Sequence, residues 1–299
     1  MKTKLFSLAG IAMLFFLGSC SNDDSAPNQF VIQNPEITGY KITSNTTHPG
    51  NADLPTILSM TIGNVQDGKL VSATRENIID GVSQGSQTIL AFTFSNNLVT
   101  KREAEGDIKD FFYDANRNLI AINWHRAAGD DNYYRFVNAT PAIVYIEKLT
   151  LPYDNALAQI ARRSIVEFNA HDQIIRAGRD FNLDGVNDDE SHFEYTSDNV
   201  TAIHLNDGTV NTYTYSPVYE NFQLLMEQTL GKRVQWLLDS ETFSFQPAKS
   251  VAFSHKVSSE EYSSATYELA GEYYTKKTKT TSDVGAGIEN TTVTEFFFN

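Results

Sequence analysis

The stretch Phe111-Phe112-Tyr113-Asp114-Ala115-Asn116-Arg117-Asn118-Leu119-Ile120 contains the pattern that decides the fold. Aromatic residues at alternate positions precede a polar turn, and an apolar pair follows it. Alternating aromatic and polar residues predict a strand with one buried face. Asn and Asp tolerate the left-handed backbone of a tight hairpin. The stretch therefore predicts two antiparallel strands joined by a short turn.

The same pattern recurs along the chain. It returns over residues 92–99, in looser form over 166–175 and 193–200, and without the turn from Tyr213. Successive hairpins of this kind form an antiparallel meander. The sequence therefore predicts an all-β protein, an antiparallel β-meander that forms a single large curved sheet or a barrel-like one.

One segment departs from this pattern. Apolar residues at 222, 225, 226 and 230 share one face of a helix, and Gly231 suits the position that follows its last turn. We predict one short helical insert over residues 219–230 that plugs one end of the sheet; the alternative is a ligand groove beneath this helix. A further helical turn or a linker is expected over residues 154–163, and a loop over residues 282–287.

Composition limits the function classes. The 299 residues are 41% hydrophobic and 12% aromatic, which is typical of a folded, β-rich chain. Lys and Arg number 23 against 37 Asp and Glu, a net charge of −14. Nucleic acid is therefore excluded as an expected partner, because binding phosphates requires a basic face.

The N-terminus resembles an export signal. A basic start, Met1-Lys2-Thr3-Lys4, precedes an apolar run from Leu5 to Leu17 that is shorter than the ~20 residues a membrane helix needs. Leu17-Gly18-Ser19-Cys20 resembles a lipobox, and Cys20 is the single cysteine of the chain. We predict a signal peptide over 1–19 and lipidation of Cys20; the alternative is an ordinary signal peptide with a chance cysteine.

Residues 20–34 are polar and acidic, and we expect them to form a flexible tether before a single β-rich domain over 35–299. Ser21-Asn22-Asp23-Asp24 resembles the acidic signal that directs lipoproteins of Bacteroidetes to the outer face of the outer membrane. Asp24-Ser25-Ala26 resembles the short O-glycosylation motif of that phylum. The expected location is the outer membrane, lipid-anchored and exposed at the cell surface.

The hairpin units resemble YD or RHS-like repeats, most closely over residues 113–119. More broadly, residues 35–299 resemble a group of uncharacterised Bacteroidetes surface lipoproteins built from degenerate YD-like hairpins. That resemblance implies a helical insert over 219–230, a strand start over 246–251 and an aromatic closing strand over 291–298. It implies an architecture and a location, and no molecular activity.

One acidic segment, residues 180–190, matches the first part of an EF-hand-type calcium loop. Oxygen-bearing side chains alternate, and Gly185 permits a sharp turn. Ser191 stands where such loops place a bidentate Glu, and strands are expected on both sides; the alternative is therefore an acidic hairpin turn. The predicted Ca²⁺ ligands are Asp180, Asn182, Asp184, Val186 through its carbonyl, Asp188 and Glu190.

Trp124 and Trp236 are candidates for a platform on which a glycan stacks; the alternative is that both belong to the strand core. No nucleophile motif, phosphate-binding loop or zinc-type histidine spacing is present in the sequence, so an enzyme is not expected. We predict a binding or structural module that associates with the membrane through its lipid and with a glycan or another surface protein. The alternatives are a glycan-active lipoprotein enzyme and an accessory subunit of an outer-membrane uptake system.

Overall fold

A computed structural model describes residues 36–51, 53–240 and 254–299, which belong to one compact unit, Val31–Asn299. The strands are β1 (Ile37–Thr47), β2 (Ile57–Gln66), β3 (Lys69–Ile79), β4 (Val82–Ser95), β5 (Leu98–Ala104), β6 (Asp107–Tyr113), β7 (Leu119–His125), β8 (Asn132–Asn138), β9 (Ile143–Leu149), β10 (Ile160–Phe168), β11 (Ile174–Asp180), β12 (Asp189–Thr196), β13 (Asn199–His204), β14 (Val210–Thr212), β15 (Tyr215–Tyr219), β16 (Lys256–Ser258), β17 (Thr266–Ala270), β18 (Tyr273–Asp283) and β19 (Ile288–Phe298). The helices are α1 (Asn221–Leu230), α2 (Lys232–Ser240) and α3 (Ser259–Ser263).

Seventeen of the strands form one antiparallel sheet. From β1 to β14, each strand pairs with the next along the chain, and β17, β18 and β19 form a second run. Strand β1 joins the two runs because it pairs with both β2 and β19. The predicted single antiparallel meander is confirmed, and the sheet is open, with β14 and β17 at its edges.

The predicted turn chemistry closes the hairpins. Asn96 and Asn97, between β4 and β5, have φ angles of 49° and 67°, and Asp67 and Gly68, between β2 and β3, have 50° and 70°. Two successive left-handed residues twist a two-residue turn in the sense of its flanking strands. Local turn residues thus set the register of the meander.

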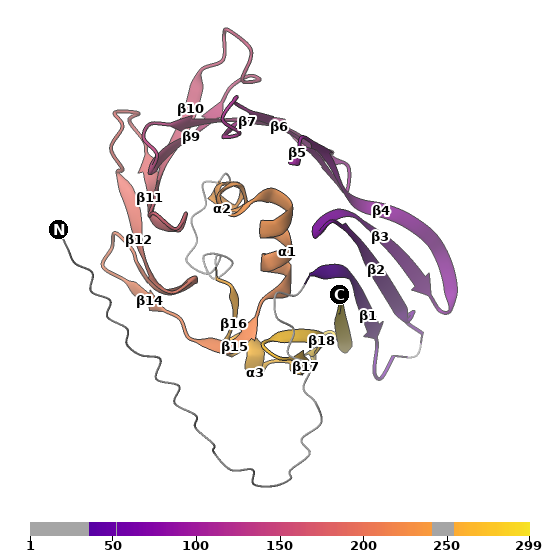
Figure 1. The fold of residues 1–299 in the computed structure, drawn as a ribbon. Coiled ribbons are helices and arrows are strands. Elements are labelled where there is room, and N and C mark those ends of the chain that lie inside the picture. Colours follow the sequence, from indigo (N-terminus) through magenta and orange to yellow (C-terminus); the bar gives the residue numbers. More distant parts are fainter. Residues whose placement is uncertain (1–35, 52, 241–253) are drawn as a thin grey trace, which may run out of the picture. The chain divides into compact units, whose positions relative to one another are not determined.

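The sheet curves around helices α1 and α2 (Figure 1). Leu225 of α1 and Trp236 of α2 are fully buried and belong to one hydrophobic cluster with the inward-facing residues of the strands. The backbone N–H of Leu70 on β3 donates to the Thr229 hydroxyl at 2.9 Å, which ties the helix to the sheet. The predicted helical insert is present, and it fills the concave side of the sheet rather than plugging one end of it.

A short ribbon of β15 and β16 lies between the two sheet edges (Figure 1). The N–H of Tyr219 donates to the carbonyl of Glu272 at 2.7 Å, in the turn between β17 and β18. The N–H of His255 donates to the carbonyl of Asp198 at 3.2 Å, beside β13. The ribbon therefore links the two edges without closing the main sheet.

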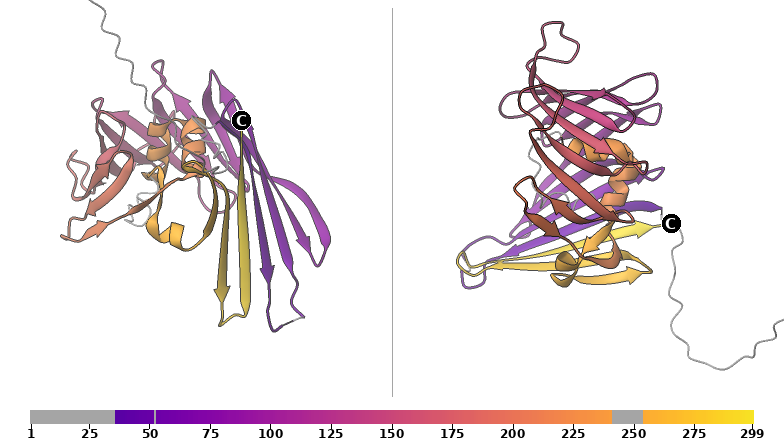
Figure 2. Two further views of the ribbon diagram at one scale, coloured as in Figure 1. Left: turned by 60° about the horizontal axis from the view of Figure 1, so that its bottom comes forward. Right: turned by 90° about the vertical axis from the view of Figure 1, so that its left-hand side faces the viewer.

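The long strands near the two ends of the unit extend past the helices (Figure 2). In β4 the first seven residues are all exposed, so this part of the sheet has no buried face. Closer to the helices, Tyr40 on β1 lies over Gly63 on β2, where a Cβ would come within 2.0 Å of the ring. Only glycine, which has no Cβ, leaves room for the buried ring of Tyr40 at this position.

Some expectations need correction. Residues 154–163 form no helix: they contain turns and the start of β10, because Ile160 to Arg163 continue the pairing with β9. Helices α2 and α3 are additional to the predicted insert. The expected strand start over 246–251, like residues 1–35, lies outside the described residues. Within the described part of the chain, no helix is long and apolar enough to cross a membrane.

Candidate functional site

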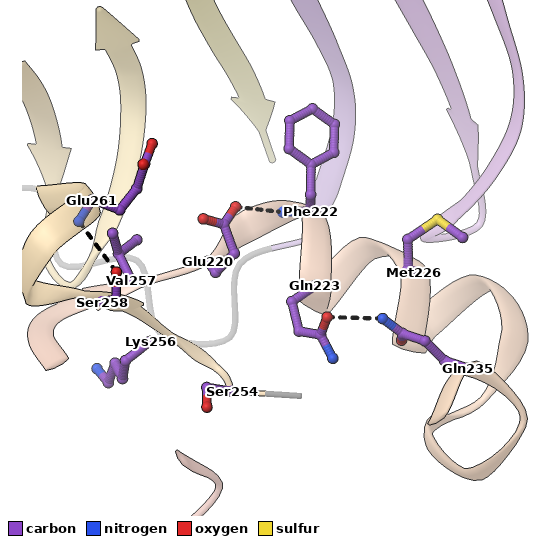
Figure 3. A pocket seen from close by; sticks show the side chains of 10 residues that line it. All are labelled: Glu220, Phe222, Gln223, Met226, Gln235, Ser254, Lys256, Val257, Ser258 and Glu261. Carbon is purple, nitrogen blue, oxygen red and sulfur yellow. Dashed lines mark hydrogen bonds between the residues drawn. The ribbon is translucent and has the colours of Figure 1, made fainter. Parts of the chain in front are cut away.

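A pocket of about 500 Å³ opens between helix α1, strand β16 and helix α3 (Figure 3). Phe222 and Met226 of α1 and Val257 of β16 supply its apolar surface. The pocket volume lies within the roughly 300–1,000 Å³ that small-molecule sites occupy. The polar lining residues are Glu220, Gln223, Gln235, Ser254, Lys256, Ser258 and Glu261.

Two helix starts set the shape of this pocket. The Glu220 side chain caps α1 by accepting from the N–H of Phe222 at 3.4 Å. The Ser258 hydroxyl caps α3 by accepting from the N–H of Glu261 at 3.2 Å. Because N-cap residues leave the helical path, the chain turns sharply at both points and brings Glu220 and Glu261 to the same cavity.

A pair of buried amides forms the inner wall. Nε2 of Gln235 donates to Oε1 of Gln223 at 2.9 Å, and both side chains are more than nine-tenths buried. Oε1 of Gln235 is buried and accepts no hydrogen bond from any described residue. A buried carbonyl without a donor costs roughly 1–3 kcal/mol, so a rotation of Gln235 that exposes Oε1 to the pocket would let a ligand donor satisfy it.

The two carboxylates at the pocket are in different settings. Burial alone would raise the pKa of Glu261, but hydrogen bonds from Lys277 and Lys279, at 2.7 and 2.9 Å, outweigh it and lower that pKa. Glu220 accepts from the hydroxyl of Tyr274 at 3.0 Å and forms no ion pair with a described residue. Burial, followed by the charge of Glu220, raises the pKa of Tyr274, which therefore remains a neutral donor.

Lys256, which lines the pocket, is bound by residues that do not line it. Nζ of Lys256 donates to the carbonyl of Pro217 at 2.6 Å, pairs with Glu272 at 3.3 Å and lies 3.4 Å from the ring centre of Tyr219. Its charge is thus already compensated. Glu220 remains the uncompensated charge of the lining, so the pocket favours a ligand with hydrogen-bond donors or an ammonium group.

The predicted tryptophan platform does not form. Trp236 has no exposed surface and stacks on Tyr195 at 6.0 Å, so no sugar can reach its ring. Trp124 lies on β7, where Nε1 donates to Asp107 at 3.0 Å and Nζ of Lys109 lies 4.2 Å from the ring centre. Trp236 is a core residue, as the alternative interpretation predicts.

The predicted calcium ligands lie in a loop that folds over the outer face of β9 to β11. The Asp180 carboxylate accepts from the N–H groups of Asp184 and Gly185 at 3.1 and 2.9 Å. The N–H of Val186 donates to Asp184 at 2.8 Å, and that of Phe181 to Asp188 at 2.6 Å.

The remaining predicted ligands are also occupied. The side-chain oxygen Oδ1 of Asn182 accepts from the N–H of Asp184 at 3.0 Å. Glu190 contacts Asn187 and His192 at 3.2 and 2.9 Å. In the described part of the chain, no group of three or more His, Cys, Asp or Glu side chains is placed to hold a metal ion. The structure therefore does not bring the predicted calcium ligands around one point.

The guanidinium of Arg163 binds oxygen atoms of this loop, as a metal cation would. Nη1 of Arg163 donates to Asp180 at 3.2 Å and to the carbonyl of Leu183 at 3.1 Å, while Nη2 donates to Glu147 at 2.9 Å. Both carboxylates are buried. Burial lowers the pKa of Arg163, but its bonds with Glu147 and Asp180 outweigh this and raise it. Arg163 thus supplies the positive charge that the loop oxygens require.

Sequence reasoning missed the pocket residues. Gln223 and Gln235 lie on helix faces that a purely apolar pattern would leave to solvent, yet both are buried. The signal was a pair of glutamines on either side of Gly231, which the interpretation of Gly231 as the end of the helical insert concealed. Cys20, the predicted lipidation site, lies outside the described residues.

Comparisons with known proteins assign no family to this chain. No protein-family model matches the chain, and no curated protein matches its sequence. A crystal structure of a porin-like protein from Bacteroides uniformis is similar with a TM-score of 0.28 and 9% identity, over 62% of this chain and 96% of that chain. A TM-score this low does not show a common fold.

We expect Arg163→Met to destabilise the protein by about 3–5 kcal/mol, because it leaves Asp180 buried without its cation and leaves Glu147 with Arg135 alone. At roughly 2–4 °C per kcal/mol for a domain of this size, thermal unfolding will show a large decrease in Tm. Arg75→Met is the matched control, since its pair with Glu105 is exposed and surface pairs contribute about 0–1 kcal/mol. Equal melting of both variants would contradict the role of Arg163.

The same melting measurement tests the calcium prediction. Because protein donors already occupy the loop oxygens, we expect the wild-type Tm to be the same in 5 mM CaCl₂ and in EDTA. A calcium-dependent rise of about 2–3 °C, the size expected at ten times Kd, would instead establish a calcium loop, provided that Asp184→Ala abolishes it.

Proposed function

We propose that this chain is an outer-membrane, surface-exposed lipoprotein that acts as a binding module, with its ligand site in the pocket between α1, β16 and α3. The observation that supports a binding role is the buried Oε1 of Gln235, which accepts no hydrogen bond from the described residues. Buried polar groups are nearly always paired in folded proteins. An unpaired acceptor on a residue that lines a pocket is consistent with a ligand that supplies the donor once the side chain turns toward it.

The pocket chemistry defines the ligand class. Phe222, Met226 and Val257 provide an apolar surface, Gln235 requires a donor, and Glu220 has no cationic partner among the described residues. A ligand that fits has several O–H or N–H donors and an apolar edge. We propose a small hydroxylated molecule that carries an amino group, such as an amino sugar.

The proposed location depends on the N-terminal segment. Cys20 at the end of a lipobox-like motif would carry the lipid, and residues 20–34 would form the tether between membrane and module. A diacylated cysteine gives stable anchoring, because more than one acyl chain is buried in the bilayer. The all-β fold is compatible with an outer-membrane-associated protein. The Asp23-Asp24 pair supports the proposed display on the outer face.

We expect Cys20→Ala to release the protein from the membrane fraction, because the thioether to the lipid can no longer form. Fractionation of cells and immunoblotting of the two fractions will measure this. The conservative change Ser19→Ala, one residue away, should leave the protein with the membranes. Membrane retention of the Cys20→Ala variant would overturn the proposed anchor.

We expect D-glucosamine to bind the chain from residue 20 onward, carrying Cys20→Ala, more tightly than D-glucose, because its ammonium pairs with Glu220. Isothermal titration calorimetry will measure both affinities. The double variant Gln223→Leu/Gln235→Leu should weaken glucosamine binding by about 10-fold or more, since one unmade hydrogen bond costs roughly 1–3 kcal/mol. Its stability should change little, because both partners of the amide pair are replaced together.

Gln228→Leu is the matched control, as Gln228 is exposed on the same helix. It should bind glucosamine as the wild type does. Absence of glucosamine binding, or equal binding by the double variant, would exclude this pocket as the site.

A further inference from the structure

A second cleft opens between two hairpin turns and shares no residue with the pocket beside α1. Its volume is about 560 Å³. The turn between β4 and β5, residues 95–98, forms one side, and the turn between β6 and β7, residues 114–117, forms the other. Tyr153, from the connection between β9 and β10, completes the lining.

Aromatic rings form one wall of this second cleft. Phe112 on β6 and Tyr153 lie with ring centres 4.7 Å apart, and both are half-buried. Their planes are tilted by 47° to each other, so the two rings present separate aromatic faces. Such faces bind the C–H surface of a sugar ring by the same apolar contact that they make in a core.

Arg117 lines the cleft and Lys69 is bonded to the adjoining β4–β5 turn, and neither has a carboxylate partner among the described residues. Nη2 of Arg117 donates to the carbonyl of Asn96 at 3.3 Å, and Nζ of Lys69 donates to the carbonyl and side chain of Asn97 at 3.0 and 2.5 Å. Burial, followed by the charge of Arg117, lowers the pKa of Lys69. The two positive charges therefore repel each other, in a chain where acidic residues outnumber basic ones by 37 to 23.

Asp114, the carboxylate in the lining, is used within its own turn. It accepts from the N–H groups of Asn116 and Asn118 at 2.9 and 2.8 Å and from the side-chain amide of Asn118 at 3.0 Å. These bonds hold its pKa below the usual range. Asp114 thus remains ionised and shapes the turn, and the cations at the rim are left for another anion.

Tyr113 belongs to the lining of the cleft, but its side chain packs against the hydrophobic core. The Tyr113 hydroxyl is buried and forms no hydrogen bond with the described residues. Burial raises the pKa of Tyr113 to about 12, so the group stays protonated and can donate at neutral pH. Because this hydroxyl has no exposed surface, a ligand in the cleft does not reach it.

Arg117 is in an unusual conformation for its residue type. Its φ of 69° lies in the left-handed region, which Asn or Gly occupies with less strain. Backbone strain of this kind is concentrated at functional positions. Here it accompanies a guanidinium that points to a neighbouring turn rather than to a carboxylate.

We propose that this cleft binds an anionic saccharide, with its ring against Tyr153 and Phe112 and its carboxylate or sulfate on Arg117 and Lys69. The site adds to the pocket beside α1 and does not depend on the function proposed for that pocket. A volume of about 560 Å³ suits one or two sugar rings.

The test is isothermal titration of the chain from residue 20 onward, carrying Cys20→Ala, with D-glucuronate, glucose 6-sulfate, D-glucose and sodium sulfate. We expect glucuronate, glucose 6-sulfate or both to bind, and the tighter of the two identifies the anion that the site prefers. The affinity should decrease with salt, because exposed charges are screened within about 8–10 Å at 0.10–0.15 M. Glucose and sodium sulfate should bind at least 10-fold more weakly.

Three variants separate the contributions. Arg117→Asn removes the cation while suiting the left-handed turn, and we expect at least a 10-fold loss of affinity with no loss of stability. Tyr153→Ala should weaken all the sugars but not sodium sulfate. Tyr113→Phe should leave sugar binding unchanged, since its hydroxyl has no exposed surface in the cleft. Arg75→Asn, which removes an equal charge outside the cleft, should bind as the wild type does.

Several results would overturn the proposal. Equal affinity for glucose and glucuronate would show that the cations do not recognise the ligand. Binding of sodium sulfate as tight as that of glucose 6-sulfate would show an adventitious ion only. Absence of heat with every probe, or unchanged affinity in Arg117→Asn, would also exclude the site.

Discussion

The structure depends on burial of the concave side of a seventeen-stranded sheet. A curved antiparallel sheet of this size has an apolar inner face that must pack against something, and here the helical insert α1–α2 fills it. The side chain of Trp236 is fully buried. Burial of roughly 150–250 Å² at 25 cal/mol per Å² contributes about 4–6 kcal/mol to the stability of the folded state. The meander, the ribbon β15–β16 and the pocket are arranged around this insert.

Both candidate sites follow from the way the sheet is built. The pocket beside α1 exists where the insert meets the ribbon, because two helix caps, Glu220 and Ser258, turn the chain sharply at that junction. The second cleft exists where two hairpin turns and the Tyr153 segment meet. In each case a rigid strand framework positions residues that belong to turns and helix ends. Such an arrangement is typical of proteins in which loops bind and the scaffold only holds them.

Local chemistry predicted most of the fold. The Asn and Asp turns, the alternation in strands such as β6 and the Gly231 end of α1 act over a few residues, so the sequence shows them directly. The sequence did not show the non-local contacts. Arg163 lies opposite Asp180 only through the register of β10 with β11, and so the acidic loop resembles a metal site until that partner is known. Likewise, nothing near Trp236 in sequence shows that α2 lies inside the sheet.

The central claim is that insert and sheet form one cooperative unit. Urea unfolding of the chain from residue 20 onward, carrying Cys20→Ala and Trp124→Phe, tests it most directly, because Trp236 then reports on the insert alone. Its fluorescence and the far-ultraviolet circular dichroism of the strands are followed on the same samples. The account predicts coincident transitions with a common midpoint. A change in Trp236 fluorescence at lower urea, while the strand signal persists, would contradict it.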